Sequence, residues 1–526
     1  MSAFAGTPTL VRLILRRDRI RIPVWLVAIT GLTALSANAV QAFYDTPEKV
    51  LGYEATVTSS ASSRLTNGRP YSLDTLEGIT AYEVTMAALV AGALMTIFLV
   101  VRHTRAEEES GRAELLRGAA TGRHAAILAT MLVATGCSVA LGALDALALA
   151  ANGLPVAGSV LHGAALGGVA LVFAAVAAVT SQVTAAARGA LGTASSLLGA
   201  AFLVRGIGDV TQTWPSWLSP LGWAQAVDAF GDPRWWPPAA LVALAGVLLA
   251  GAAWLAAHRD AGAGLVHPRP GRPRAAAWLA TPVGLAWRLQ RASVLSWSIG
   301  LGVFGALFGS VGNEVVDMVA TNPDLAAAIG AATGDVLDAF FATTAGIMAV
   351  IGAGFTVSSA LRLRAEEAAG RAEALLATGV SRTSWALGSL TVTAAGTVAS
   401  LLVAGLGTGI SYALVSGDGE AVAALALASV ALAPASLALG AATLLLFGWW
   451  PRAAVAGWAL LALAFVQSYL GELLDLPGWL SGLSPYFHLP RLPLDAFATA
   501  PVLALLAVTA ALAVLGIVGL RRRDVG

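Results

Sequence analysis

Apolar blocks, each about as long as a membrane-crossing helix, restrict the fold of this chain more than any other feature. A helix needs about 20 apolar residues to span the hydrocarbon core of a bilayer, and such blocks follow one another along the 526 residues. Charged residues make up 12% of the chain, whereas soluble domains carry about 25%. The sequence therefore predicts an all-α polytopic membrane protein and excludes a soluble or an intrinsically disordered chain.

We expect about twelve membrane spans, of which the pair between residues 158 and 207 is the least distinct. The expected spans are 22–41, 79–101, 125–150, 158–180, 189–207, 238–257, 293–311, 342–361, 384–415, 421–447, 454–472 and 501–520. With the N-terminus in the cytoplasm, 25 basic residues fall in inner segments and 6 in or near outer ones. Because basic residues favour the cytoplasmic side, we expect both termini there.

The sequence also repeats itself once, at an offset of 259 residues. Residues 105–123 and 364–382 share RAEE, GRAE, a leucine and an arginine, which gives ten identities within 19 positions. Three further pairs agree with small drifts: Thr7-Pro8 with Thr281-Pro282, Ser219-Pro220 with Ser484-Pro485, and Arg259-Asp260 with Arg523-Asp524. The repeat predicts two parallel six-span halves, 1–262 and 281–526, joined by a Pro/Arg-rich cytoplasmic linker at 263–280.

Each half opens with a basic amphipathic segment, at residues 7–21 and 281–291. Thr7 can cap such a helix, and Pro8 suits its first position, where no backbone donor is needed. We expect two elbow helices in the cytoplasmic interface. The alternative is a plain basic flank of the first span, and the second copy favours the defined helix.

The two repeated RAEE…GRAE loops, at 103–120 and 362–379, are too polar for membrane and too short for a domain. The expected i,i+4 ion pairs are Glu108 with Arg112 and Glu367 with Arg371. Gly111 and Gly370 predict a kinked or two-piece helix. A short charged helix with leucines suits docking into a groove of a soluble partner. A solvated connector whose charges pair with one another remains the alternative.

At this point the chain resembles the permeases of type-two ABC exporters. The residues that carry the resemblance are EExxGRAExL followed by Arg after the second span, a basic elbow before the first, Ser-Pro before the last, and an Arg-Asp tail, each present twice. The usual Gly-Thr of the signature is Gly-Arg here. The fused, Arg-rich form is similar to actinobacterial antibiotic exporters of the tetronasin and polyketide kind, which implies a bacterial plasma membrane protein.

The resemblance implies that the two loops are coupling helices, on which two copies of an ABC ATPase subunit dock. The implied docking residues are Arg105, Glu107, Glu108, Gly111, Arg112, Glu114 and Leu116 in the first copy, and Arg364, Glu366, Glu367, Gly370, Arg371, Glu373 and Leu375 in the second. ATP and Mg would be used by that partner. This chain is expected to bind no cofactor or metal and to have no catalytic residue.

The lysine content supports the expectation that a separate subunit hydrolyses the ATP. Lys49 is the one lysine among 31 basic residues, and no glycine run precedes it. A phosphate-binding P-loop needs GxxxxGK[ST], so the chain cannot carry a standard one. A net charge of +1 argues against a nucleic-acid partner. Cys137 lies in an apolar run and is expected to be a packing residue.

Ionisable residues within the spans are functional candidates by default. The expected substrate-path candidates are Glu83, Asp145, His162 and Arg205. Each of them could instead serve in pairing or at the interface. The other histidines, including His103, His124 and His488, are expected to be ordinary interface residues, and no motif of a hydrolase or a metal site is present.

The sequence thus favours an ATP-driven exporter permease for amphipathic drugs or antibiotics, embedded in membrane lipid. A proton-coupled twelve-span drug antiporter is the alternative, although few carboxylates lie deep in the spans. An integral membrane enzyme is a third possibility, for which no catalytic constellation is visible.

Overall fold

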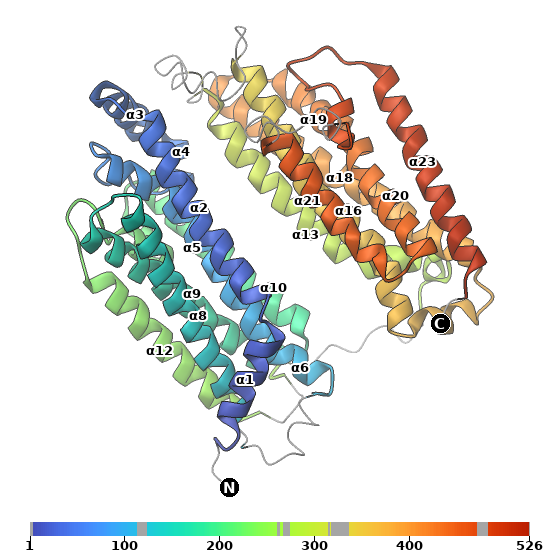
Figure 1. The fold of residues 1–526 in the computed structure, drawn as a ribbon, viewed down its shortest axis with the longest axis horizontal. Helices are drawn as coiled ribbons and strands as arrows, with labels where there is room; N and C mark the ends of the chain where they lie inside the picture. The colour runs from blue at the N-terminus through green and yellow to red at the C-terminus, as the bar shows by residue number, and fades with distance from the viewer. Residues whose placement is uncertain are drawn as a thin grey trace. The chain divides into compact units, whose positions relative to one another are not determined.

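The computed structural model describes residues 4–112, 122, 124–259, 264–266, 274–313, 316, 336–470 and 482–524. The chain divides into two compact units, Met1–Pro270 and Gly271–Gly526. Within the described ranges both units consist of α-helices and short 3-10 helices, with no β-strand (Figure 1). The fold is therefore the all-α polytopic membrane architecture that the apolar blocks predict.

The first unit is built around α9, which packs against α5, α8, α10 and α12. Its long helices are α2 (Arg21–Phe43), α5 (Leu76–His103), α8 (Ala125–Ala151), α9 (Val156–Val183), α10 (Ala187–Val210) and α12 (Trp236–Ala257). Its shorter helices are α1 (Thr7–Arg17), α3 (Pro47–Ser59), α4 (Ala61–Thr66), α6 (Arg105–Glu109), η1 (Trp214–Leu218) and α11 (Pro220–Gln225). In Figure 1, α1 and α6 lie at one end of the unit, and α3 and α4 lie at the other.

The second unit repeats this order with some changes. Its long helices are α13 (Pro282–Ser310), α16 (Val336–Ala368), α18 (Arg382–Ser416), α20 (Ala433–Trp449) and α23 (Thr499–Arg522), and α19 (Ala421–Ala431) and α21 (Gly457–Leu470) are of intermediate length. Its shorter helices are η2 (Ala277–Ala280), α17 (Arg371–Leu376), η3 (Ala453–Ala456) and η4 (Pro485–His488). Helix α13 packs along α18, and α20 contacts both α16 and α23.

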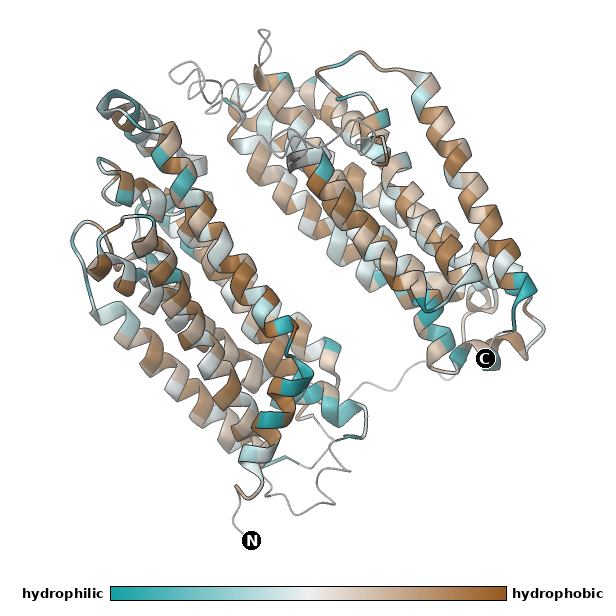
Figure 2. Ribbon diagram, viewed as in Figure 1, coloured by the Kyte–Doolittle hydropathy of each residue, from teal (hydrophilic) through white to brown (hydrophobic). Residues whose placement is uncertain are grey.

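Eleven helices among the described residues are long and apolar enough to cross a membrane. They include both members of the least distinct expected pair. The twelfth expected span, 454–472, coincides with a shorter apolar helix, Ala453–Ser468, and its last two positions lie outside the described residues. Figure 2 shows hydrophobic residues along the middle of the long helices and hydrophilic residues gathered near their ends.

The first helices of the two units differ. Helix α1 ends at Arg17 and α2 begins at Arg21, because Asp18 between them bonds to His103 (Oδ2–Nε2 2.6 Å) and pairs with Arg102 (3.3 Å) at the end of α5. The position equivalent to Asp18 in the second unit is Ala292. Helix α13 runs through it without a break, so the expected elbow segment 281–291 is the start of the first long helix.

The two Thr-Pro pairs also differ in what they do. The Thr281 hydroxyl accepts a hydrogen bond from the backbone N–H of Gly284 (3.0 Å) and caps α13, and Pro282 occupies its first position. The Thr7 hydroxyl instead donates to the carbonyl of Phe4 (2.7 Å), and Gly6, at φ 83°, precedes α1. The expectation that Thr7 caps the first helix is therefore wrong.

The expected span 421–447 contains a break. It consists of α19 and α20, which meet at Leu432. Pro434 is the second residue of α20, and a proline lacks a backbone donor and crowds the carbonyl four residues earlier, here that of Val430 in α19. The other long expected span, 384–415, is the single unbroken helix α18.

Small residues bring α8 and α9 into close contact. A Cβ atom placed on Gly142 of α8 would lie 2.3 Å from the carbonyl oxygen of Gly163 on α9, and one on Gly167 would lie 2.7 Å from the carbonyl oxygen of Ser138. Gly163 and Gly167 form a GxxxG pair, which lets helix backbones approach closely where no hydrophobic effect drives association.

We therefore predict that Gly142→Ala lowers the melting temperature of the detergent-solubilised protein, because the added methyl group forces α8 and α9 apart. Gly136→Ala on the same helix is the matched control, since a Cβ there meets nothing within 4 Å. It should leave the melting temperature unchanged or raise it slightly, because alanine is favoured over glycine in a helix by about 1 kcal/mol. Equal effects of the two substitutions would contradict the close contact.

Candidate functional site

We refer to residues 103–120 and 362–379 as the first and second coupling segments. The first begins with α6, which ends at Glu109 and is followed by Gly111 at φ 73°. In the second, α16 continues to Ala368, Gly370 lies at φ 70°, and α17 follows. The prediction of a kinked or two-piece helix is confirmed for the second segment, and the break after α6 agrees with it.

Backbone conformation, and not crowding, explains the two glycines. A Cβ atom at either position would meet nothing within 4 Å. The left-handed region is nevertheless costly for other residues, by about 1 kcal/mol or more, and glycine adopts it freely. Each glycine therefore follows the end of a helix, α6 in the first segment and α16 in the second, and redirects the chain at the same point of the repeat.

The expected i,i+4 ion pairs are wrong. Arg371 pairs with Glu366 (Nε–Oε2 2.6 Å), and the partner of Arg112 is Glu107, at 3.8 Å. The physical reason is the left-handed glycine between the carboxylates and the arginine, which interrupts the helical register on which i,i+4 pairing depends. The hydrogen bond from Arg371 to Glu366 raises the pKa of this guanidinium above its usual value.

Three acidic residues of the first coupling segment, Glu107, Glu108 and Glu109, contact other parts of the same unit. Glu107 pairs with Arg17 at the end of α1 (2.8 Å), which raises the pKa of Arg17. Glu108 accepts from Arg105 (2.6 Å) and from Arg259, just beyond α12 (2.6 Å). An oxygen of Glu109 accepts from the backbone N–H of Ala187, the first residue of α10 (2.8 Å), where a carboxylate is favoured by the helix dipole.

The second coupling segment repeats the contact to the end of the last helix. Both carboxylate oxygens of Glu367 bind Arg523, at 2.5 and 2.6 Å. Arg382, the arginine that closes the repeated motif, donates to the backbone carbonyls of Arg521 (3.3 Å) and Arg523 (2.5 Å). These groups lie at the C-terminal end of α23, where carbonyls lack helical partners.

The second segment also has an outward surface. Arg371, Glu373 and Ala374 of α17 are exposed, and so is Gly370. Ala372 is buried, while Leu375 is half-buried and packs against the apolar cluster that includes Leu363. Arg364 is half-buried. In the first segment Arg105 is buried and Arg112 is exposed, whereas Glu114 and Leu116 lie outside the described residues.

Two of the expected substrate-path residues, Asp145 and His162, form a buried polar chain inside the first unit. Asp145 on α8 binds His162 Nδ1 on α9 (2.7 Å) and accepts from the Thr33 hydroxyl on α2 (2.8 Å). His162 Nε2 in turn contacts Thr85 on α5 (2.9 Å). The chain joins four spanning helices, and Asp145 is completely buried.

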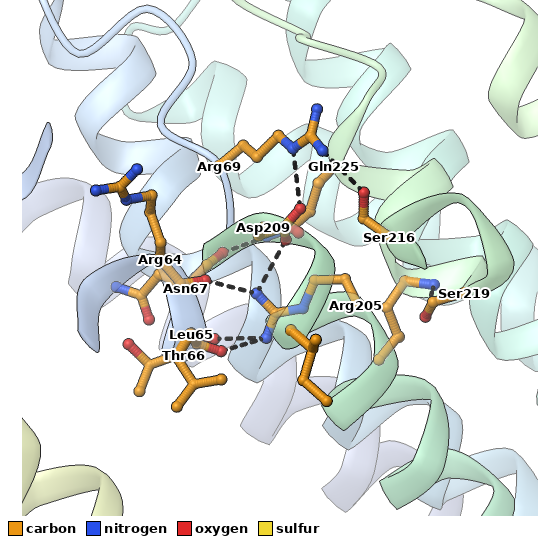
Figure 3. A network of polar contacts seen from close by, with 12 residues as sticks. Arg64, Leu65, Thr66, Asn67, Arg69, Arg205, Asp209, Ser216, Ser219 and Gln225 are labelled. Carbon is orange, nitrogen blue, oxygen red and sulfur yellow. Dashed lines mark hydrogen bonds and ion pairs between the residues drawn. The ribbon is translucent and has the colours of Figure 1, made fainter. Parts of the chain in front are cut away.

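Arg205 plays a different part (Figure 3). Its guanidinium is completely buried and donates to the backbone carbonyls of Arg64 (3.2 Å), Leu65 (2.7 Å) and Thr66 (3.1 Å), the last residues of α4. It also approaches Asp209, which pairs with Arg69 at 3.0 Å. A cation is favoured at the C-terminal end of a helix. Arg205 therefore anchors the short helix α4 to α10.

Glu83, the remaining expected path residue, accepts a hydrogen bond from the hydroxyl of Tyr53 on α3. Burial is the main reason that the pKa of Tyr53 is raised well above its usual range. Glu83 thus links α5 to the end of the unit that carries α3 and α4. The structure brings Asp145 and His162 together, and it places Glu83 and Arg205 in contacts of their own.

A small cavity reaches the buried polar chain. It has a volume of about 40 Å³ and is lined by His162 and Thr85 together with Tyr71, Tyr82 and Asp228. One water needs roughly 10–15 Å³ by this measure, so the cavity has room for a few water molecules and not for a drug. Within the residues that the structure describes, no group of three or more His, Cys, Asp or Glu side chains could hold a metal ion.

The Asp18–His103 pair was missed in the sequence analysis, where His103 was expected to be an ordinary interface residue. His103 is buried and bonds to Asp18, and Arg102 pairs with the same carboxylate. The two partners are 85 positions apart, so no local spacing reveals the contact. The one available signal was a lone aspartate within a strongly basic segment.

Two helical units with helices able to cross a membrane, each with a copy of the repeated charged motif after its second long helix, define a polytopic membrane protein with an internal repeat. The chain belongs to the family described as multidrug efflux system permease Rv1217c, C-terminal domain, whose sequence model matches residues 9–256 and 279–521. It is 39% identical over 531 aligned positions to the multidrug efflux system permease protein Rv1217c of Mycobacterium tuberculosis (strain ATCC 25618 / H37Rv), and the alignment covers 100% of this chain and 96% of that protein.

The buried chain gives a prediction about stability. Asp145→Ala should lower the free energy of unfolding by about 2 kcal/mol, because His162 and Thr33 lose a buried partner. A thermal-shift measurement in detergent checks this. Asp232→Ala is the control, since the Asp232 side chain is 77% exposed and exposed ion pairs contribute little. Equal melting temperatures for the two variants would contradict the arrangement.

Proposed function

We propose that this chain is the complete transmembrane part of an ABC exporter, energised by two copies of a separate ATPase subunit that dock on the two coupling segments. The observation that carries the proposal is that some charged residues of these segments bind within their own unit while others are exposed. Glu107, Glu108 and Glu367, which precede the two glycines, bind arginines elsewhere in their own unit and hold the segments to it, while α17 after Gly370 presents Arg371 and Glu373 outward. A helix that docks into a groove of a partner must have a face exposed to that partner.

The docking surface therefore contains fewer residues than the repeated motif. Glu107, Glu108 and Glu367 engage partners in their own unit, and we assign to them the support of the segment. Glu373 is exposed on α17 of the second segment. Glu114 is its counterpart in the first, 259 positions earlier.

The charge distribution supports the orientation that this function requires. Basic residues cluster in the segments that share one side with the coupling segments, in a ratio of 25 to 6. Positive residues favour the cytoplasmic side of a membrane, where ATP is available. We therefore propose a bacterial inner-membrane location with both termini in the cytoplasm.

The relative's printed name, multidrug efflux system permease, supports an efflux role for this chain as well. We propose amphipathic substrates of the drug or antibiotic type, including polyketide-like compounds, since apolar residues make up 57% of the sequence. ATP and Mg would act in the partner, because a P-loop needs a lysine after a glycine-rich run and Lys49 has none before it.

Co-purification tests the docking surface. The tagged chain is co-expressed with each ABC ATPase subunit of its own genome and purified in detergent. One subunit should be retained by the unaltered chain, and Glu373→Arg should reduce its retention about fivefold without lowering the melting temperature. Glu420→Arg is the matched control, because Glu420 is an exposed carboxylate between the far end of α18 and the start of α19. If no ATPase is retained, or if Glu373→Arg has no effect, the proposed docking is wrong.

The energy source gives a second test. Efflux of a fluorescent amphipathic dye such as ethidium should continue when a protonophore collapses the proton gradient and ATP is maintained. Collapse of efflux under that condition would identify a proton-coupled antiporter instead. The same measurement with ATP depleted and the gradient intact is the reciprocal control, in which the proposed exporter should stop.

A further inference from the structure

The same ion pair closes one end of both units. In the first unit it joins Glu108 of the coupling segment to Arg259, just beyond the last long helix, α12. In the second it joins Glu367 to Arg523, just beyond the last long helix, α23. The two carboxylates stand 259 positions apart and the two arginines 264. We call these contacts the two locks.

The first lock is a buried network. The side chains of Glu108 and Arg259 are 12% and 9% exposed. Arg259 also donates to the side chain of Gln182 near the end of α9 (2.6 Å), and Arg105 bridges Glu108 to the carbonyl of Ala185 (2.6 Å). Glu108 is therefore the point at which α6, the end of α9 and the end of α12 meet.

The second lock reaches the same result with different neighbours. Two parallel hydrogen bonds join Glu367 to Arg523, which is the strong and directional form of an arginine–carboxylate pair. The guanidinium of Arg523 lies 4.8 Å from the ring centre of Phe447 on α20. Arg382 donates a hydrogen bond to the backbone carbonyl of Arg523 (2.5 Å). The end of α23 is thus fixed in position and in orientation.

Stability alone is a weak reason for such contacts. Removing two charges from water costs several kcal/mol, and well-packed apolar side chains often stabilise a protein as much or more. What an ion pair adds is a defined geometry between two elements. Both locks connect the segment that reaches outward to the helix that ends its unit.

We propose that the two locks transmit movement from the coupling segments to the last span of each unit, so that Glu108, Arg259, Glu367 and Arg523 are positioning residues for transport. This inference rests on the proposed function, in which an ATPase moves the coupling segments. A displacement of α17 passes through the turn at Gly370 to Glu367 and from there to the end of α23. The first segment acts on α12 through Glu108 in the same way.

A charge swap in the second lock tests this. The unaltered chain, Glu367→Arg, Arg523→Glu and the double variant are purified with the ATPase subunit that binds the chain, and are placed in vesicles. ATP hydrolysis and ethidium transport are measured on the same vesicles. Each single variant should keep hydrolysing ATP but move at least about fivefold less dye per ATP, and the double variant should recover most of that ratio.

Two controls separate transmission from folding. Arg522→Glu makes the same change at the exposed neighbouring residue and should leave the ratio of transport to hydrolysis unchanged. Glu367→Gln keeps the size of the side chain while removing its charge, so it should fold and lower the ratio in the same direction. Melting temperatures identify any variant whose loss is one of folding, because misfolding reduces hydrolysis and transport together.

An unchanged ratio in a folded Glu367→Gln or Arg523→Glu complex overturns the proposal, and so does a double variant that recovers nothing. Failure of the proposed function looks different. In that case no ATPase is retained even by the unaltered chain. Without an ATPase there is no ATP-driven movement for the locks to transmit. A retained and active ATPase with an unchanged ratio refutes the locks alone.

Discussion

A carboxylate near the end of the second long helix binds an arginine at the end of the last one, and this contact organises one end of each unit. Glu108 and Glu367 are largely buried and are neutralised within the chain. Neighbouring arginines complete the contact: Arg105 is buried against Glu108, and Arg382 donates to the backbone carbonyl of Arg523. Because these groups bind partners within their own unit, the exposed charged residues of the second segment lie on α17, beyond Gly370.

The two units use different chemistry between their spans. The first contains an ionisable pair, Asp145 with His162. The second has alanine at position 404, 259 residues after Asp145, and its helices are joined by neutral groups. These contacts include Ser298 with Ser400 (3.0 Å) and Thr356 with Thr397 (2.7 Å). Ionisable residues within a membrane are costly and commonly functional. The Asp145–His162 pair therefore makes the first unit the one in which a functional polar contact between spans is expected.

The hydropathy of the chain and the positions of helix-breaking glycines predicted much of the fold. Eleven apolar blocks appear as helices able to cross a membrane, and the two glycines interrupt helices as their positions suggested. These features depend on local chemistry, which a sequence displays directly. The continuous helix α13 could have been foreseen from Ala292, where the first copy has Asp18, once that aspartate's role in ending α1 was known.

The pairing of charges could not be predicted in the same way. The expected partner of Glu367 was Arg371, four residues away, whereas its actual partner, Arg523, is 156 positions away. Arg205 was considered for the substrate path because it is ionisable, but its partners are backbone carbonyls 139 to 141 positions distant. Backbone carbonyls are present at every residue, so no side-chain pattern marks the ones that a buried arginine binds. Helix packing decides these contacts.

The central claim, that an ATPase docks on the coupling segments, is tested most directly by a site-specific cross-link. Cys137 is the one cysteine of the chain and is buried, so Cys137→Ala gives a background without thiols. Ala374→Cys then places a single thiol on the exposed face of α17. A bifunctional thiol–amine reagent should join this site to a co-expressed ABC ATPase, and should not do so from Asp418→Cys at the other end of α18. Absence of the adduct, or equal adducts from both sites, would contradict the account.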